Sequence, residues 1–180
     1  SVEATGDFDP DGDGIDFWES LEGMRIAVNT PAVVGPTRTF TSSGTAEITV
    51  VPGDTDSMGA HAGVRSARGA LVSGPGDFNP ERIIVQLPLS SSPPSLDVGA
   101  TFAAPIVGTI DYNFENFKLL PVGPLAEATS TLTRETLAFG ARAEDELDVA
   151  TFNVENLDPR DPREKFERLA HIVVDNLASP

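Results

Sequence analysis

Hydrophobic and polar residues alternate with a period of two along much of the chain. The alternation is clearest at Ala46, Ile48 and Val50, and it returns between Ile106 and Tyr112. A period of two sends successive side chains to opposite faces of a β-strand. Short β-branched runs between clusters of Gly, Pro, Ser, Asn or Asp predict six strands, at residues 24–28, 45–51, 68–73, 81–87, 105–114 and 117–121.

The segment DFWESLEG, at residues 16–23, has the pattern of a short helix instead. Asp16 is expected to be the N-cap, Glu19 to complete a capping box, and Gly23 to stop the helix. One short helix followed by five or six short strands predicts a mainly β fold. We expect a small closed barrel or a sandwich over residues 16–122.

Residues 123–146 lose this alternation and are rich in Ala, Thr and Glu, so we expect a linker there. A strand is predicted next, at residues 147–154. A helix should follow, with Asp161 as its cap, Pro162 in the first position and Glu164 closing a capping box. Its apolar stripe would need a sheet to cover it and consists of Phe166, Leu169, Ala170, Val173 and Leu177.

The composition is that of a folded β protein. Hydrophobic residues make up 39% of the 180 residues, and ten Phe provide bulk for a core. Fifteen Pro and sixteen Gly disfavour a helical bundle. No apolar run approaches the roughly 18 residues of a membrane span. The start of the chain has no signal-peptide pattern, so an exported protein would be present here in processed form.

The charge of the chain argues against a simple nucleic-acid binder. The formal net charge is −16, and Lys118 and Lys165 are the only lysines. Such a surface repels phosphates unless its arginines cluster or a metal ion intervenes. The chain has no Cys, which excludes thiolate catalysis, cysteine zinc sites and disulfides.

The common catalytic motifs are missing from the sequence. There is no GxSxG elbow, no phosphate-binding GxxxxGK[ST] loop and no dinucleotide fingerprint. The two histidines are His61, in a Gly-rich loop, and His171, in the final predicted helix. Each is expected to be an ordinary solvated or packed side chain rather than a catalytic base.

The first candidate site is the acidic segment at residues 1–15, which we expect to be a loop. Carboxylates at alternate positions with Gly between them can turn several oxygens onto one Ca²⁺ ion. Neither register of an EF-hand-like loop supplies the closing Glu, since the twelfth positions are Trp18 and Ser20. A solvated acidic turn is the alternative. The candidate calcium ligands are Asp7, Asp9, Asp11, Asp13 and Asp16.

The second candidate is FNVENLD, at residues 152–158. Asn153 and Glu155 lie two positions apart at the end of the predicted strand, so their side chains should project the same way. Sites in open α/β sheets gather beyond the carboxyl ends of strands. In isolation, such a pair is more typical of a turn.

The segment LDVATFNVENLDPRDPREKFERLAHIVVDNL resembles the first strand and helix of the DNase I-like endonuclease/exonuclease/phosphatase fold of bacterial secreted nucleases. The segments DGIDFWESLEGM, VVGPT (33–37), NPERI (79–83) and GTIDYNFENFKLLP (108–121) resemble the OB-fold-like domain that precedes the catalytic domain in those nucleases. The resemblance covers nearly all of residues 12–180. Its most specific pieces are DFWESLEGM and FNVENLD.

The resemblance implies a metal-dependent phosphodiesterase. It places Asn153 where an Asn orients the scissile phosphate and Glu155 where an acidic residue helps to hold a divalent ion, Mg²⁺ or Ca²⁺. Such an ion offsets the charge that develops in phosphodiester hydrolysis. The strands expected to bring the main metal-binding Glu and the catalytic His and Asp would follow Pro180. We therefore expect this chain to be an inactive fragment with a scaffold or substrate-positioning domain.

The resemblance also implies an extracellular or cell-surface location and a nucleic-acid substrate for the parent enzyme. The rest of the catalytic domain is the expected partner of residues 147–180, and exchange of this segment between two chains is a further expectation. No membrane partner is expected. The alternative function is a calcium-stabilised extracellular interaction module without an enzymatic role.

Overall fold

The structure is a computed structural model that describes residues 7–53, 64–75, 79–130, 132–133, 151–154 and 156–176. The chain divides into two compact units, Ser1–Leu132 and Thr133–Pro180. Within the described ranges, no helix has the length and apolar character needed to cross a membrane.

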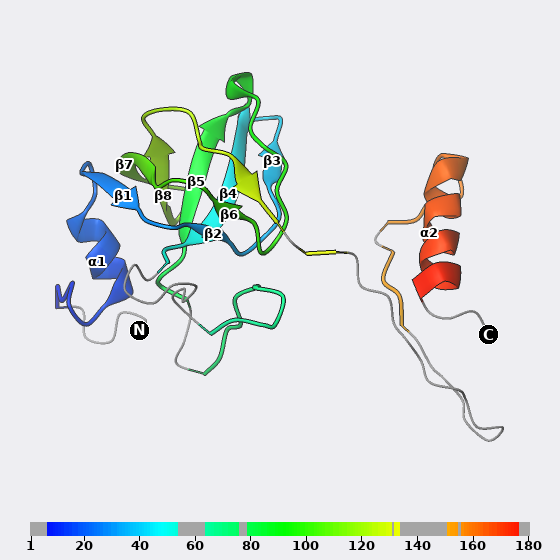
Figure 1. Ribbon diagram of the computed structural model, residues 1–180, viewed down its shortest axis with the longest axis horizontal. Helices are drawn as coiled ribbons and strands as arrows, with labels where there is room; N and C mark the ends of the chain where they lie inside the picture. Colours follow the sequence, from blue (N-terminus) through cyan, green and yellow to red (C-terminus); the bar gives the residue numbers. More distant parts are fainter. Residues whose placement is uncertain are drawn as a thin grey trace. The chain divides into compact units, whose positions relative to one another are not determined.

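The first unit is built around one β-sheet (Figure 1). Its strands are β1 (Arg25–Val28), β2 (Ala32–Val33), β3 (Arg38–Phe40), β4 (Thr45–Val51), β5 (Ile83–Pro88), β6 (Thr101–Phe102), β7 (Ile106–Asn113), β8 (Asn116–Pro121) and β9 (Ala128–Thr129). Among the described residues the order is β1-β7-β8-β5-β4-β2-β6-β9, and β3 also pairs with β4. The sheet is mixed because β5 and β8 run parallel, and it curls into half of a barrel.

The core lies on the inner face of this curled sheet. In β4 the buried Ile48 and Val50 alternate with the half-buried Glu47 and Thr49, which face the other way. Full burial of one such aliphatic side chain stabilises the fold by roughly 1.5–3 kcal/mol. The largest fully buried side chains of the core cluster are Ile48, Ile83, Ile110, Leu119, Val33, Val50 and Val85.

The mainly β prediction is confirmed. The strands expected at residues 24–28, 45–51, 81–87, 105–114 and 117–121 correspond to β1, β4, β5, β7 and β8. Four further strands were not expected. Each contains only two or three residues, which is too short for an alternation to show.

The prediction of a strand at residues 68–73 is wrong. Leu71 forms only an isolated bridge with Arg65, and residues 68–73 contribute no strand to the sheet. The strand β9 lies within the range expected to be a linker and pairs with β6 through Thr101 and Phe102. The sheet therefore extends beyond residue 122.

Helix α1 (Gly14–Ser20) is present but starts earlier than expected. Asp13 is the N-cap, because its Oδ1 accepts hydrogen bonds from the amides of Ile15 at 2.8 Å and Asp16 at 3.4 Å. The expectation that Asp16 caps the helix is wrong. Asp16 lies buried in the first turn, where its Oδ2 accepts from the amide of Asp9 at 2.5 Å.

The capping box expected between Asp16 and Glu19 is consequently wrong as well. The helix ends at Ser20, and Gly23 follows with a φ of +74°, which Gly adopts without a steric cost. The amide of Gly23 donates to the carbonyl of Ile110 at 2.9 Å. Gly23 thus turns the chain from α1 into the edge of the sheet.

The described part of the second unit contains helix α2 (Arg163–Asn176), which confirms the expected helix. It begins one residue after Pro162. The carboxylate of Asp161 accepts from the amide of Asp158 at 2.9 Å and from the ammonium of Lys165 at 2.6 Å. Asp161 thus organises the turn that leads into the helix and its first turn.

The strand expected at residues 147–154 is not seen where it can be judged. Residues 151–154 form no strand, and residues 147–150 lie outside the described residues. Leu177, the last member of the expected apolar stripe, also lies outside them.

Candidate functional site

The five carboxylates of the acidic segment lie in the loop before α1 and in its first turn. Three of them already accept hydrogen bonds from the protein. Asp9 Oδ1 accepts from the amide of Gly12 at 3.2 Å, Asp13 caps the helix and Asp16 holds the amide of Asp9. Asp7 and Asp11 are exposed. The loop is therefore ordered by its own carboxylates.

These carboxylates do not converge on one point. Among the described residues, no group of three or more His, Cys, Asp or Glu side chains could hold a metal ion. All five candidate Ca²⁺ ligands lie within the described residues, where Asp13 caps α1 and Asp9 and Asp16 accept hydrogen bonds from loop amides.

The second predicted pair is only partly within the structure. Asn153 is described and exposed in the segment 151–154, whereas Glu155 lies outside the described residues, as does His61. His171 is exposed on α2, and its Nδ1 lies 3.3 Å from Asp175 Oδ2. His171 therefore lies outside the sites formed by the described residues.

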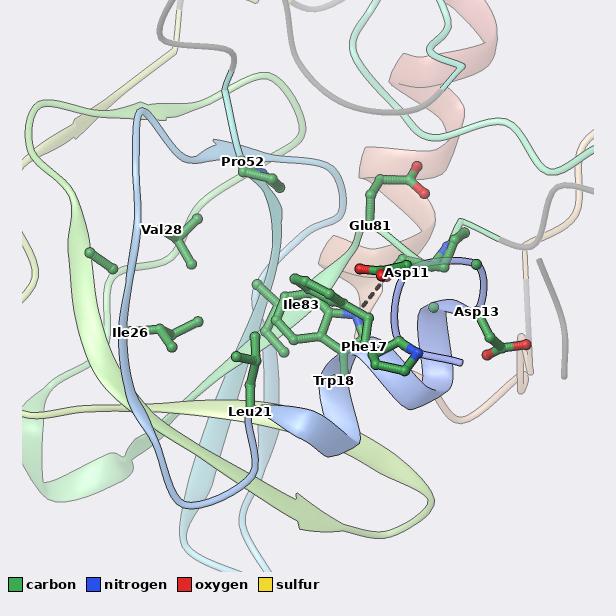
Figure 2. A pocket seen from close by; sticks show the side chains of 15 residues that line it. Asp11, Asp13, Phe17, Trp18, Leu21, Ile26, Val28, Pro52, Glu81 and Ile83 are labelled. Atoms are coloured by element: carbon green, nitrogen blue, oxygen red, sulfur yellow. Dashed lines mark hydrogen bonds between the residues drawn. The ribbon is translucent and has the colours of Figure 1, made fainter. Parts of the chain in front are cut away.

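A cavity of about 580 Å³, which no sequence pattern predicted, lies beside α1 (Figure 2). Its apolar wall is formed by Trp18 of α1 and the C-cap residue Leu21, together with Ile26 and Ile83 from the sheet. The indole Nε1 of Trp18 donates to the carbonyl of Pro80 at 2.7 Å. This hydrogen bond fixes the helix over one end of the curled sheet.

The charged residues that line the α1 cavity are all acidic. They are Asp11, Asp13 and Glu81. Asp13 Oδ2 and Glu81 Oε1 are buried without a hydrogen-bond partner among the described residues. A phosphate would meet only negative charge here, so this cavity is unsuited to a polyanion.

A second hollow, of about 660 Å³, lies on the outer face of the sheet, opposite the core. The strand register shows which residues form the floor of this hollow. Arg38 of β3 lies opposite Glu47 of β4, and Glu47 lies opposite Gln86 of β5. Lys118 of β8 points to the same face. We call this hollow the outer-face groove, and the lining residues that matter here are Arg38, Phe40, Glu47, Gln86, Phe114 and Lys118.

Lys118 is the centre of the floor of the groove. Its side chain is only 3% exposed, and its Nζ lies 2.6 Å from Glu47 Oε1 and 3.1 Å from Gln86 Oε1. The ring of Phe114 lies over the same ammonium, at 5.3 Å from Nζ to the ring centroid. These contacts link β4, β5 and β8 in one polar network on the outer face of the sheet.

Phe114 is held in an unusual turn. Phe114 and Glu115 form the two-residue connection between Asn113 and Asn116, which pair across β7 and β8. Their φ angles are +48° and +60°. Two positive φ angles in a two-residue hairpin loop are the pattern of a type I′ turn, which prefers Asn-Gly. A bulky Phe with positive φ is an outlier of the kind that clusters at functional sites.

The sequence carried one signal of this groove that was not recognised. The stretch NFEN, at residues 113–116, places a Phe where a hairpin turn favours Asn or Gly. The remaining members could not be found without the strand register. Glu47, Gln86 and Lys118 are far apart in sequence and look like ordinary outward-facing polar residues.

Comparison with known proteins finds a family match that spans most of the first unit. The chain matches a domain of unknown function, DUF8508, over residues 1–130. No curated protein and no solved structure gives a significant match. The match covers most of the chain and ends close to the boundary of the first compact unit at Leu132. The chain therefore belongs to the DUF8508 family.

Proposed function

We propose that this chain joins an OB-like scaffold domain to the start of the catalytic domain of a secreted, metal-dependent nuclease. The observation that carries the proposal is a shared boundary. The family match ends at residue 130 and the first compact unit ends at Leu132. The segment that resembles the first strand and helix of a DNase I-like domain, residues 147–177, lies wholly in the second unit.

The exposed apolar side of α2 supports this assignment. Phe166 is 37% exposed, Val173 is 38% exposed and Val174 is 55% exposed. A helix with an apolar stripe is stabilised mainly by packing that stripe against another element. In the described part of the second unit no strand is present to cover it. A DNase I-like fold would supply a sheet for this purpose.

The scaffold role of the first unit is favoured by its charge and shape. A curled, partly open sheet with a helix over one end is compatible with an OB-like barrel. Its α1 cavity is bordered by Asp11, Asp13 and Glu81, and the whole chain carries a net charge of −16. A strand of nucleic acid would be repelled by these groups. Support and placement of the catalytic domain is therefore the role we assign to this unit.

The nuclease metal site is not complete in the described residues. Asn153 could orient a phosphate, and Glu155 would be one of several oxygen ligands for Mg²⁺ or Ca²⁺. No described group of three or more acidic or histidine side chains accompanies Asn153. No hydrolytic step is therefore assigned to this chain, and the proposal places the chemistry on the remaining strands of a catalytic domain.

The coding sequence after the Pro180 codon provides the most direct test. The proposal expects it to encode a strand that ends in a Gln-Glu pair, followed by further strands that carry His and Asp. A stop codon at this point, or an unrelated sequence, would contradict the proposal.

A plasmid-nicking assay with Mg²⁺ or Ca²⁺ gives an independent readout. The purified 180-residue chain should leave supercoiled DNA intact. The longer protein should nick it, and Asn153→Ala should lower that rate by at least tenfold without changing the thermal unfolding of the first unit. Nicking by the 180-residue chain would show that the active site is complete without further strands.

A further inference from the structure

We propose that the outer-face groove binds a neutral saccharide, with one face of a sugar ring on Phe114 and its hydroxyls on the polar floor. The proposal concerns the first unit only and does not depend on the nuclease assignment. It rests on three features: the buried ion pair of the floor, the exposed Phe of the turn, and the charge balance of the lining residues.

The buried ion pair is not explained by stability. Transfer of Lys118 and Glu47 out of water costs several kcal/mol for each ion, and a well-packed apolar pair of similar volume is often equally stable. Their burial does, however, fix the positions of polar atoms. Lys118 donates hydrogen bonds to Glu47 Oε1 and Gln86 Oε1. Among the described residues, the acceptor Glu47 Oε2 and the donor Gln86 Nε2 have no other partner. A hydroxyl can use both kinds of group at once.

The aromatic side chains of the groove offer contact surface at its edge. Phe114 is 82% exposed in spite of its strained turn, and a smaller polar residue would suit that turn better. Phe40 lies at the end of β3, and the guanidinium of Arg38 is 5.2 Å from the centre of its ring. A flat apolar surface beside fixed hydrogen-bonding groups matches a sugar ring, which has an apolar C–H face and polar edges.

Charge selects the class of ligand. The ammonium of Lys118 is neutralised by Glu47, so Arg38 is the one cation among the lining residues that lacks a carboxylate partner within 4 Å in the described structure. A single guanidinium on a chain of net charge −16 does not attract a polyanion. Arg38 can instead donate to sugar oxygens. The volume of 660 Å³ lies within the usual range of small-ligand pockets, about 300–1,000 Å³, and suits about two sugar rings.

The test is a titration of the full ¹⁵N-labelled chain with neutral disaccharides: maltose, cellobiose, lactose and N,N′-diacetylchitobiose. At least one should bind in the millimolar range or tighter and shift the amide signals of residues 38–47 and 113–118. A dT oligonucleotide serves as the polyanionic probe. Shifts in these two segments with the oligonucleotide alone, or with none of the probes, would overturn the proposal.

A substitution at the turn separates binding from folding. Phe114→Asn removes the ring while giving the type I′ turn a residue that it prefers, so the fold should be retained or slightly stabilised. Affinity for the disaccharide should fall at least tenfold. Phe8→Asn is the matched control, because Phe8 is 63% exposed and lies outside the groove. Unchanged affinity in Phe114→Asn, or equal losses in both variants, would contradict a site on Phe114.

Discussion

Lys118 of β8 and Glu47 of β4 meet across β5, with 2.6 Å between Nζ and Oε1 and with the lysine side chain 3% exposed. Removal of one partner leaves a buried charge without compensation. We expect Glu47→Ala to lower the free energy of unfolding by about 3–5 kcal/mol. Urea denaturation followed by far-UV circular dichroism measures this loss.

The double variant Lys118→Met with Glu47→Leu is the informative companion. It removes both charges and keeps apolar volume, so its stability should lie within about 1 kcal/mol of the natural chain or exceed it. A loss in the double variant equal to the sum of the losses in the single variants Lys118→Met and Glu47→Leu would show that the two residues act independently. The pair would then not be the buried unit that the structure shows.

Trp18 is the only Trp of the chain and fixes α1 to the sheet. Trp18→Phe keeps most of the ring packing but loses the hydrogen bond to Pro80, which should cost about 1 kcal/mol. Trp18→Ala also leaves a cavity and should cost about 3 kcal/mol. Thermal unfolding of both variants tests whether Trp18→Ala loses more stability than Trp18→Phe. Equal losses would show that the hydrogen bond dominates.

The fold was predictable from the sequence wherever a strand was long enough to show its alternation. In β4 the buried positions Ala46, Ile48 and Val50 recur at every second residue. The strands β2 and β6 have two residues each, and pairing with neighbours rather than local sequence determines them. The start of α1 was misplaced because Asp13 and Asp16 are both good caps. In the structure Asp13 is the cap, and the carboxylate of Asp16 accepts from the amide of Asp9.

The candidate sites were less predictable because they depend on register. The approach of Lys118 to Glu47 requires β8 to lie parallel to β5, and nothing local in either strand encodes that pairing. Conversely, the alternating carboxylates of the acidic segment form a clear sequence pattern, and in the structure several of them accept hydrogen bonds from backbone amides. The same spacing that could surround an ion also places carboxylates on backbone amides, as Asp9 and Asp13 show.

Asp13 and Asp11 provide a matched pair of substitutions in that segment. Asp13→Ala removes the N-cap of α1 and should lower stability by about 1 kcal/mol. Asp11→Ala removes the same charge from an exposed side chain that has no hydrogen bond among the described residues, and stability should change by less than about 0.5 kcal/mol. Urea midpoints of the two variants test this, and equal effects would point to net charge rather than capping.

Calcium should have little effect on the acidic segment. Asp9, Asp13 and Asp16 each accept a backbone hydrogen bond through one oxygen, and no group of three described acidic side chains is placed to hold one ion. Addition of 5 mM Ca²⁺ should raise the Tm by no more than the same concentration of Mg²⁺ does. A calcium-specific rise that Asp9→Asn abolishes would establish a calcium site and favour an interaction module.

Acid should loosen the start of α2 through two carboxylates. The hydrogen bond from Lys165 lowers the pKa of Asp161, with a smaller contribution from the amide of Asp158, and the hydrogen bonds from Arg160 lower the pKa of Asp158. A pKa that is lowered in the folded state stabilises that state above the unfolded value, about 3.9 for Asp. This stabilisation is lost as the pH falls through the folded pKa. The helical Cα chemical shifts of residues 163–167 should therefore decrease between about pH 5 and pH 2.

Asp161→Asn tests whether this acid effect comes from the turn before α2. The variant keeps the size of the side chain but lacks the charge that Lys165 binds. Its first helical turn should be weaker at pH 7 and should respond less to acid than that of the natural chain. Asp175→Asn, near the other end of α2, should leave the acid response of residues 163–167 unchanged. An identical response in the natural chain and in Asp161→Asn would locate the titrating group elsewhere.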